Sequence, residues 1–333
     1  MKLKEKFKGA LIGTFLGDSL GKEAEGKRKL EEDYIEKIKS SDYVWDGDYT
    51  DDTEMMIALS EALIEDKDFN PKKIAQKFVE NYHSFRGYGR GARKVIKLLK
   101  NGKPWDEVAK ESFPGGSFGN GAAMRIAPVG LLYFEDEDML IRNAILSSII
   151  THYHPLGVEG GVIMAYAVAM AVKKDPRTFI PIDFVDVLIE KEPYIREEVY
   201  KYTYRYEGED QETYFYSLKR IKTYLLENHV PLKVVKKQMG TSSKAHRSVP
   251  TAIYLFLRHF GNPFEGILDA ISMRGDTDTI GGMVGALGGA LFGLDVFPGE
   301  KIEQLTDEGK GRSYIFSLAE KLCEKAGCRE GID

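Results

Sequence analysis

The 333-residue chain contains only two cysteines, Cys323 and Cys328, without a second pair or histidines at metal-ligand spacing around them. This scarcity excludes a disulfide-scaffold protein, and a structural zinc site is not expected. The apolar part of the N-terminal segment lacks a small-residue cleavage site, so we expect no signal peptide. A cytoplasmic location with reduced thiols is the resulting prediction.

Long apolar runs and an excess of positive charge are also missing. The nearest approach to a membrane span, residues 280–294, is about five residues too short and begins beside Asp276 and Asp278. The 47 basic and 52 acidic residues give a net charge of −5, and no basic patch dominates, so neither a membrane nor duplex nucleic acid is expected as a partner. The composition that remains, 43% hydrophobic and 11% aromatic, is that of a globular protein with a sizeable core.

Apolar residues recur at three- and four-residue spacing through most of the chain, which predicts α-helices, and convincing strand patterns are missing. Prolines stand where helices begin, as in Asn70-Pro71, His154-Pro155 and Val249-Pro250. The length alone favours about two domains, but no linker divides the chain, and we predict one all-α domain over residues 1–333. The expected helices are 53–66, 72–85, 92–100, 138–151, 156–172, 212–226, 249–260 and 312–326.

Two segments carry a glycine at every fourth position. The glycines are Gly9, Gly13, Gly17 and Gly21 in the first segment, and Gly281, Gly285, Gly289 and Gly293 in the second. On a helix this spacing lines one face with glycine, at a penalty of about 1 kcal/mol per interior glycine relative to alanine. We therefore predict two buried helices whose backbones cross closely.

Acidic clusters lie near both glycine-rich segments. The first contains Asp46, Asp48, Asp51, Asp52 and Glu54, and the second contains Asp276, Thr277, Asp278 and Thr279. Helix capping explains one or two acidic residues at a helix start, but not five. An EF-hand is excluded because Asp51 replaces the turn glycine and Ile57 occupies the twelfth position. If the clusters meet, their repulsion and oxygen ligands favour a binuclear site for Mg²⁺ or Mn²⁺.

Three further motifs each have a structural and a functional interpretation. The glycine-rich segment 115–125, which leads toward an apolar helix, is either a seat for a diphosphate or a flexible connection. His152 and His154 lie at a helix junction, as structural or as binding residues. The tyrosines at 200, 202, 204 and 206 either line a substrate mouth or belong to a solvated helix.

Five motifs together resemble the ADP-ribosylglycohydrolase family, the group typified by the dinitrogenase reductase activating glycohydrolase and the ADP-ribosyl-acceptor hydrolases. The motifs are GALIGTFLGDSLG followed by Glu25, Thr50-Asp51-Asp52-Thr53, GSFGNGAAMR, Thr151-His152 and Gly275-Asp276-Thr277-Asp278-Thr279. They occur in the family's order between about residues 5 and 295. The resemblance implies a compact, single-domain all-α fold with two Mg²⁺ ions at the base of an ADP-ribose cleft, Mn²⁺ being the alternative metal.

The resemblance also implies residue roles. The metal ligands would be Thr50, Asp51, Asp52, Asp276, Asp278 and Thr279, and the catalytic residues would be Glu25, Asp51 and Asp278. Ser117, Gly119, Asn120 and Gly121 would bind the diphosphate, and His152 would lie near the distal ribose. Lys22-Glu23 departs from the family pattern, which leaves Glu23 as an alternative to Glu25.

The implied activity is Mg²⁺-dependent hydrolysis of the bond that links ADP-ribose to an acceptor, with arginine on a protein as the first expectation. Serine-linked, O-acetylated or other ADP-ribose conjugates are alternatives. A non-catalytic ADP-ribose binder and a Mg²⁺-dependent hydrolase of free nucleotides are the competing functions. The expected partner is an ADP-ribosylated protein or a small ADP-ribose conjugate, and a monomer is expected.

Overall fold

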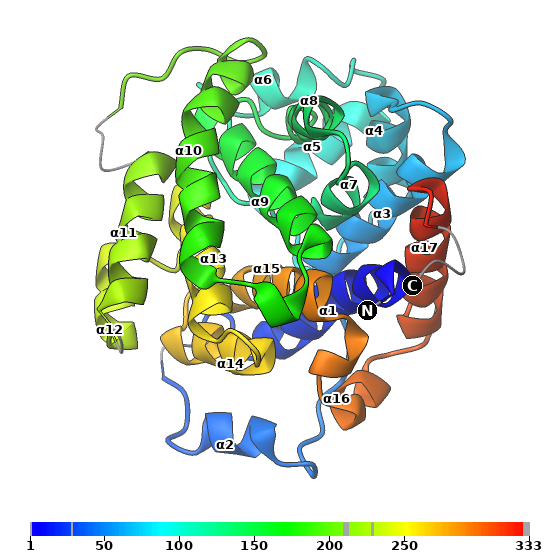
Figure 1. The fold of residues 1–333 in the computed structure, drawn as a ribbon. Helices are drawn as coiled ribbons and strands as arrows, with labels where there is room; N and C mark the ends of the chain where they lie inside the picture. Colours follow the sequence, from blue (N-terminus) through cyan, green and yellow to red (C-terminus); the bar gives the residue numbers. More distant parts are fainter. Residues whose placement is uncertain (1, 28, 209–212, 228–229, 329–333) are drawn as a thin grey trace.

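The computed structural model describes residues 2–27, 29–208, 213–227 and 230–328, and within these ranges it is built from helices without a β-strand (Figure 1). The prediction of an all-α fold is confirmed. The α-helices are α1 (Leu3–Lys22), α2 (Tyr34–Lys39), α3 (Asp51–Glu65), α4 (Pro71–Glu80), α5 (Arg90–Lys100), α6 (Val108–Ser112), α7 (Ala127–Leu132), α8 (Glu137–Ser148), α9 (Pro155–Lys173), α10 (Pro181–Tyr200), α11 (Tyr214–Leu226), α12 (Leu232–Gln238), α13 (Ala245–Arg258), α14 (Pro263–Met273), α15 (Thr277–Phe292), α16 (Gly299–Gln304) and α17 (Arg312–Lys325). Short 3₁₀ helices, η1 and η3, cover Pro176–Thr178 and Leu294–Val296.

The centre of the molecule is the crossing of α1 and α15, which come from opposite ends of the chain and lie side by side in Figure 1. A Cβ added to Gly285 would lie 1.9 Å from the Gly13 carbonyl oxygen, and one added to Gly17 would lie 2.1 Å from the Gly281 carbonyl oxygen. Backbone therefore contacts backbone where the glycines face each other. The predicted glycine-lined crossing is confirmed.

Helix α9 is a long apolar helix that lies inside the bundle. Its length and composition would allow it to cross a membrane, yet 94% of its apolar window is buried. The sequence directed attention to residues 280–294 instead, most of which form the glycine-rich helix α15. Both are core helices in this fold.

Two predicted helix boundaries are wrong for reasons that the structure shows. Helix α4 ends at Glu80 rather than continuing to residue 85, because the chain turns there into a loop that reaches the cleft. Helix α13 begins at Ala245, and Pro250 lies inside it rather than at its start. The preceding segment is fixed by long-range bonds, from Asn120 N to Ser243 O (2.9 Å) and from Ala245 N to Phe118 O (3.0 Å).

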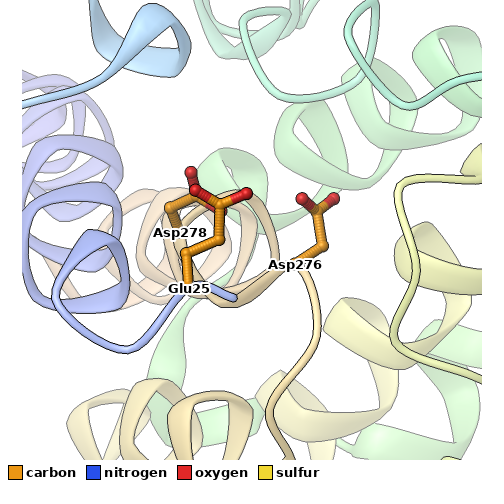
Figure 2. Close-up of side chains that lie close together, drawn as sticks. All are labelled: Glu25, Asp276 and Asp278. Atoms are coloured by element: carbon orange, nitrogen blue, oxygen red, sulfur yellow. The ribbon is translucent and has the colours of Figure 1, made fainter. Parts of the chain in front are cut away.

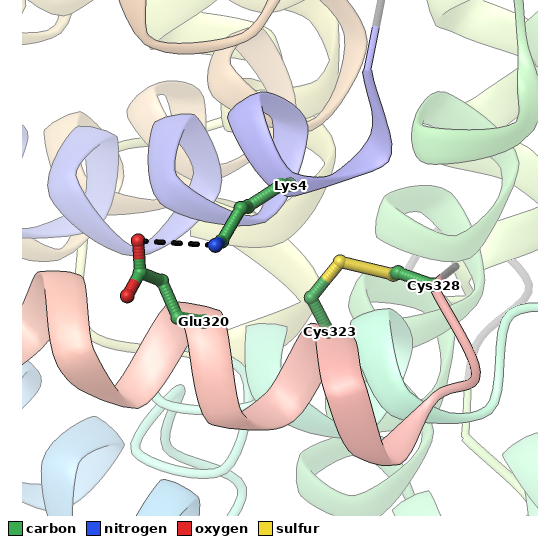
Figure 3. The surroundings of a disulfide bond; sticks show 4 residues. All are labelled: Lys4, Glu320, Cys323 and Cys328. Atoms are coloured by element: carbon green, nitrogen blue, oxygen red, sulfur yellow. Dashed lines mark ion pairs between the residues drawn. A yellow bond between two sulfur atoms is a disulfide. The ribbon is translucent and has the colours of Figure 1, made fainter. Parts of the chain in front are cut away.

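The expectation of reduced thiols is wrong: Cys323 and Cys328 form a disulfide at the end of α17 (Figure 3). The Cys328 N–H donates to the Cys323 carbonyl (2.9 Å) and the Gly327 N–H to the Glu324 carbonyl (3.0 Å), with Gly327 at φ +82°. This is a Schellman motif, in which the residue after the glycine returns to the last helical turn. The motif brings the two Cα atoms to 5.3 Å, a separation that a disulfide spans.

Candidate active site

A cleft of about 1020 Å³ contains the residues that the sequence singled out. This volume lies at the upper end of the range for small-molecule sites. Every predicted metal ligand, Glu25 and every predicted substrate-binding residue lines this cleft: Thr50, Asp51, Asp52, Ser117, Gly119, Asn120, Gly121, His152, Asp276, Asp278 and Thr279. The residues come from both ends of the chain and meet because α1 and α15 pack together.

The first turn of α3 is anchored by Asp18, a fully buried residue of α1. Its carboxylate accepts hydrogen bonds from Thr50 N (3.1 Å), Thr53 N (3.1 Å) and Thr53 Oγ1 (2.6 Å). Thr50 is the N-cap, and its hydroxyl accepts from Asp52 N at 3.3 Å. Asp18 therefore fixes the helix start that presents Asp51 and Asp52. The sequence shows Asp18 at the end of the glycine run, but nothing local reveals that it orients another helix.

The first acidic cluster separates into different roles. Asp46 pairs with Lys22, Asp48 pairs with Arg86, and Glu54 accepts hydrogen bonds from His83 N (3.0 Å) and Tyr88 Oη (2.7 Å). The Glu54 contacts hold the loop of residues 83–88 against α3, and the Asp48 contact holds it against the segment before α3. The Arg86 carbonyl in turn accepts the Asp51 N–H at 2.7 Å. Only Asp51 and Asp52 of the five acidic residues line the cleft.

Asp276 follows an unusual turn at the end of α14. Arg274 has φ +56°, the only positive φ of a non-glycine residue in the described chain, and Gly275 has φ +115°. A Cβ on Gly275 would lie 2.1 Å from the Thr241 carbonyl oxygen, the same oxygen that accepts the Asp276 N–H at 2.8 Å. Backbone conformations of this kind persist where the surroundings enforce them, commonly at functional sites.

Three carboxylates converge at the base of the cleft. One oxygen each from Glu25, Asp276 and Asp278 lies within 4.8 Å of the others (Figure 2). Burial, together with Asp276, raises the pKa of Glu25, and burial, with Asp276 and Glu25, raises that of Asp278 well above its usual range. Glu25 belongs to this group and lines the cleft, whereas Glu23 does neither.

Asp51 and Asp52 lie outside this group of three but line the same cleft. Burial and the charge of Asp18 raise the pKa of Asp51 to about 8, and burial and the charge of Asp278 raise the pKa of Asp52 well above its usual range. The Oδ1 atoms of Asp52 and Asp278 are buried and have no hydrogen-bond partner among the described residues. Buried carboxylates that repel one another and lack donors match the needs of a hard divalent cation. The residues fit Mg²⁺ or Mn²⁺.

The glycine-rich loop forms another wall of the cleft. It does not run directly into a helix, as the sequence suggested, because turns occupy residues 121–125 and α7 begins at Ala127. Gly116 has φ +81°, and a Cβ there would lie 2.3 Å from the His154 amide nitrogen. The Asn120 side chain turns inward, donating to Asp276 Oδ2 (2.5 Å) and Ser248 Oγ (2.9 Å). Asn120 therefore links the predicted diphosphate loop to a carboxylate.

The two histidines of the 151–154 segment have different positions. His152 is 6% exposed and lines the cleft. His154 is the N-cap of α9, where its Nδ1 accepts the Leu156 N–H at 3.2 Å. Tyr204 reaches the same region from the tyrosine-rich segment and donates to the Gly115 carbonyl at 2.8 Å.

Residues that the sequence did not assign also line the cleft. Phe113 and the basic residues Lys236, Lys237, Lys244 and Arg247 belong to this set, as does Arg125. Lys236 Nζ donates to the Met273 carbonyl at 2.5 Å, at the end of α14. Lys236, Lys237, Lys244 and Arg247 give the wall formed by residues 236–247 a positive charge, which favours anionic ligands in general. Their spacing in the sequence carries no recognisable signal.

The family model for ADP-ribosylglycohydrolase matches residues 1–331. The chain belongs to the ADP-ribosylglycohydrolase family. The resemblance drawn from the five motifs is thereby confirmed, and the family supports hydrolase activity on ADP-ribose conjugates.

Among curated members of this family, the chain is 33% identical over 317 residues to ADP-ribosylhydrolase ARH3 of Xenopus tropicalis, covering 88% of this chain and 89% of the relative. It is 32% identical over 319 residues to ADP-ribosylhydrolase ARH3 of Homo sapiens, covering 88% and 87%. A solved structure described as an ADP-ribosylglycohydrolase-related protein complex superimposes with a TM-score of 0.70 at 23% identity, covering 98% of this chain and 99% of that chain. That likeness concerns the fold.

Proposed function

We propose that this chain hydrolyses the bond between ADP-ribose and an acceptor with the help of bound Mg²⁺, with Mn²⁺ as the alternative ion. The observation that carries the proposal is the meeting of Glu25, Asp51, Asp52, Asp276 and Asp278 in one cleft with the glycine-rich loop and His152. The hydroxyls of Thr50 and Thr279 line the same cleft and complete an oxygen-only ligand set for two ions.

The residues of the cleft have different roles in the proposed hydrolysis. The bond at the anomeric carbon breaks through an oxocarbenium-like transition state, so the site must hold the sugar, deliver water and protonate the leaving group. Bound divalent cations supply charge compensation, anchorage for hydroxyl groups and a lowered pKa of water. Glu25, whose pKa is raised, can accept or donate a proton at its carboxyl oxygens. The wall of residues 116–121 and the basic residues of 236–247 hold the diphosphate.

The relatives named above are ADP-ribosylhydrolases, and their names do not mention arginine. Arginine-linked ADP-ribose therefore remains a prediction of the sequence alone. Defined conjugates linked through arginine, serine and O-acetyl groups, together with polymeric ADP-ribose and free nucleotides, should be incubated with the protein and either Mg²⁺ or EDTA. We expect release of ADP-ribose from at least one conjugate with Mg²⁺ and none with EDTA.

Binding of ADP-ribose without release from any conjugate would identify a non-catalytic binder and overturn the proposal. Hydrolysis of free nucleotides alone would identify the competing enzyme. A cytoplasmic location, a monomeric state and one domain over residues 1–333 remain predictions, and the packing of α1 against α15 and α17 supports the last of them.

A further inference from the structure

The two ring nitrogens of His152 have different neighbours. Its Nδ1 lies 2.7 Å from the Thr151 hydroxyl oxygen. Its Nε2 edge lies toward the glycine-rich loop, 3.7 Å and 3.5 Å from the positions that a Cβ would take on Gly119 and Gly121. Which nitrogen carries the hydrogen decides whether the cleft meets a donor or an acceptor.

Arg125 favours one direction of the bond between Thr151 and His152. This arginine is 1% exposed, and its Nη2 donates to Thr151 Oγ1 at 2.7 Å and to the Ser147 carbonyl at 3.3 Å. A guanidinium can only donate, so the threonine oxygen is the acceptor in that bond. The single hydroxyl hydrogen of Thr151 is then available for another group. Among the described residues, His152 Nδ1 is the only acceptor in contact with it.

We propose that Arg125 and Thr151 are positioning residues that fix His152 as the tautomer with its hydrogen on Nε2. The cleft then receives one neutral N–H donor between Gly119 and Gly121. Its partner is an acceptor oxygen of the bound ligand, on a phosphate or a ribose. The identity of this ligand rests on the proposed function, whereas the tautomer does not.

The surroundings also keep the ring uncharged. Burial, together with the charge of Arg125, lowers the pKa of His152 to about 3. An imidazolium would place hydrogens on both nitrogens and would oppose the Thr151 donor at Nδ1. The neutral tautomer instead satisfies the threonine hydrogen and leaves one N–H for the ligand.

Long-range ¹H–¹⁵N NMR of histidine-labelled, ligand-free protein tests the tautomer directly, with His152 assigned by its loss in His152→Gln. We expect an unprotonated Nδ1 and a protonated Nε2 in the natural protein and in Thr151→Ser, which keeps the hydroxyl. In Thr151→Val, which has nearly the same shape without the hydroxyl, the two tautomers should mix. A protonated Nδ1 in the natural protein, or an unchanged spectrum in Thr151→Val, overturns the proposal.

The affinity for ADP-ribose, measured by calorimetry, then tests whether Thr151 acts by positioning His152 or only by maintaining the structure. The apparent affinity falls in proportion to the population of the binding-competent tautomer, so an even mixture in Thr151→Val should bind roughly twofold more weakly and Thr151→Ser nearly as the natural protein. In the His152→Gln background, Thr151→Val should have no further effect, because its role passes through the imidazole. An equal loss in both backgrounds would overturn the proposal. Absence of ADP-ribose binding by the natural protein would contradict the proposed function, and the NMR result would still decide the tautomer.

Discussion

At the scale of single residues, the carboxylates that suit the site for a cation lower the stability of the metal-free protein. Burial and neighbouring carboxylates raise the pKa of Asp278, so its charge opposes folding when no cation is bound. Carboxylates with raised pKa values destabilise the native state as the pH rises above the value of the unfolded chain. These carboxylates therefore reduce the free energy of unfolding of the metal-free protein above the pKa of the unfolded chain.

Asp278→Asn should reduce turnover by at least about 100-fold, since the loss of a ligand removes several kcal/mol of transition-state stabilisation. In EDTA at neutral pH the same variant should unfold at a higher temperature than the natural protein, because a buried charge has gone. Steady-state kinetics and calorimetric melting measure the two effects. Asp295→Asn, an exposed change outside the cleft, is the control. Full activity in Asp278→Asn would refute its assignment as a ligand.

A second buried acid, Glu159 of α9, lies outside the cleft and faces Glu192 of α10. Glu159 is 2% exposed and Glu192 is fully buried. Burial, with the charge of Glu192, raises the pKa of Glu159 well above its usual range. The protonated form of Glu159 therefore stabilises the fold below the pKa of the unfolded chain, near 4.5. This stabilisation is lost as the pH rises through the pKa of Glu159 in the folded protein.

Glu159→Gln should therefore stabilise the protein at pH 8 by roughly 1–3 kcal/mol, the scale of a buried polar group left unpaired. At pH 4.5 the variant and the natural protein should have nearly equal stability. Urea unfolding at both pH values measures the difference, with the exposed Glu32→Gln as control. A gain that is the same at both pH values would contradict this electrostatic explanation.

At the scale of helices, the α1–α15 crossing is the least tolerant element. A methyl group on Gly285 would overlap the Gly13 carbonyl, since the Cβ would lie 1.9 Å from that oxygen. Gly285→Ala should cost more than about 3 kcal/mol, as overpacking does when the backbone must move. Gly299→Ala, at a helix position with open space around it, should be neutral or stabilising by up to about 1 kcal/mol. Denaturant unfolding compares them, and equal stability would refute the close crossing.

The disulfide at the end of α17 closes only a short loop, and the Schellman hydrogen bonds already hold its ends. Cys323→Ser should lower the free energy of unfolding by about 2 kcal/mol, as the chain-entropy model gives for a loop of this length. Activity should stay unchanged because neither cysteine lines the cleft. Cys328→Ser and reduction by dithiothreitol should give the same loss. A much larger loss from one serine variant alone would indicate a role beyond the cross-link.

Helix boundaries show which information the sequence carries. Periodicity identifies α3, α9 and α17 nearly to their ends, because the apolar residues that each helix buries form a regular pattern within the helix itself. The start of α13 is missed because Ser243 and Ala245 bond to residues about 120 positions away. Likewise, motif spacing indicates Asp51 and Asp278, but the roles of Asp18 and Arg125 depend on packing between distant helices.

At the scale of the whole molecule, the two acidic clusters of the cleft are more than 220 residues apart in the chain and meet only in the native state. The contacts between α1 and α15 make this meeting possible. A net charge of −5 says little about such a site, whereas the position of five acidic residues in one cleft says a great deal. Cation binding is therefore expected to be coupled to folding of the entire chain.

Because an unfolded chain cannot assemble these ligands, Mg²⁺ should stabilise only the folded protein. At a free concentration one hundred times the dissociation constant, the gain is about 2.7 kcal/mol for one site. Thermal unfolding should shift upward and saturate with Mg²⁺ or Mn²⁺, and EDTA should reverse the shift. NaCl at equal ionic strength is the control for screening, and the double variant Asp52→Asn, Asp278→Asn is the control for the ligands. An equal shift in the double variant would place the ions elsewhere on the molecule.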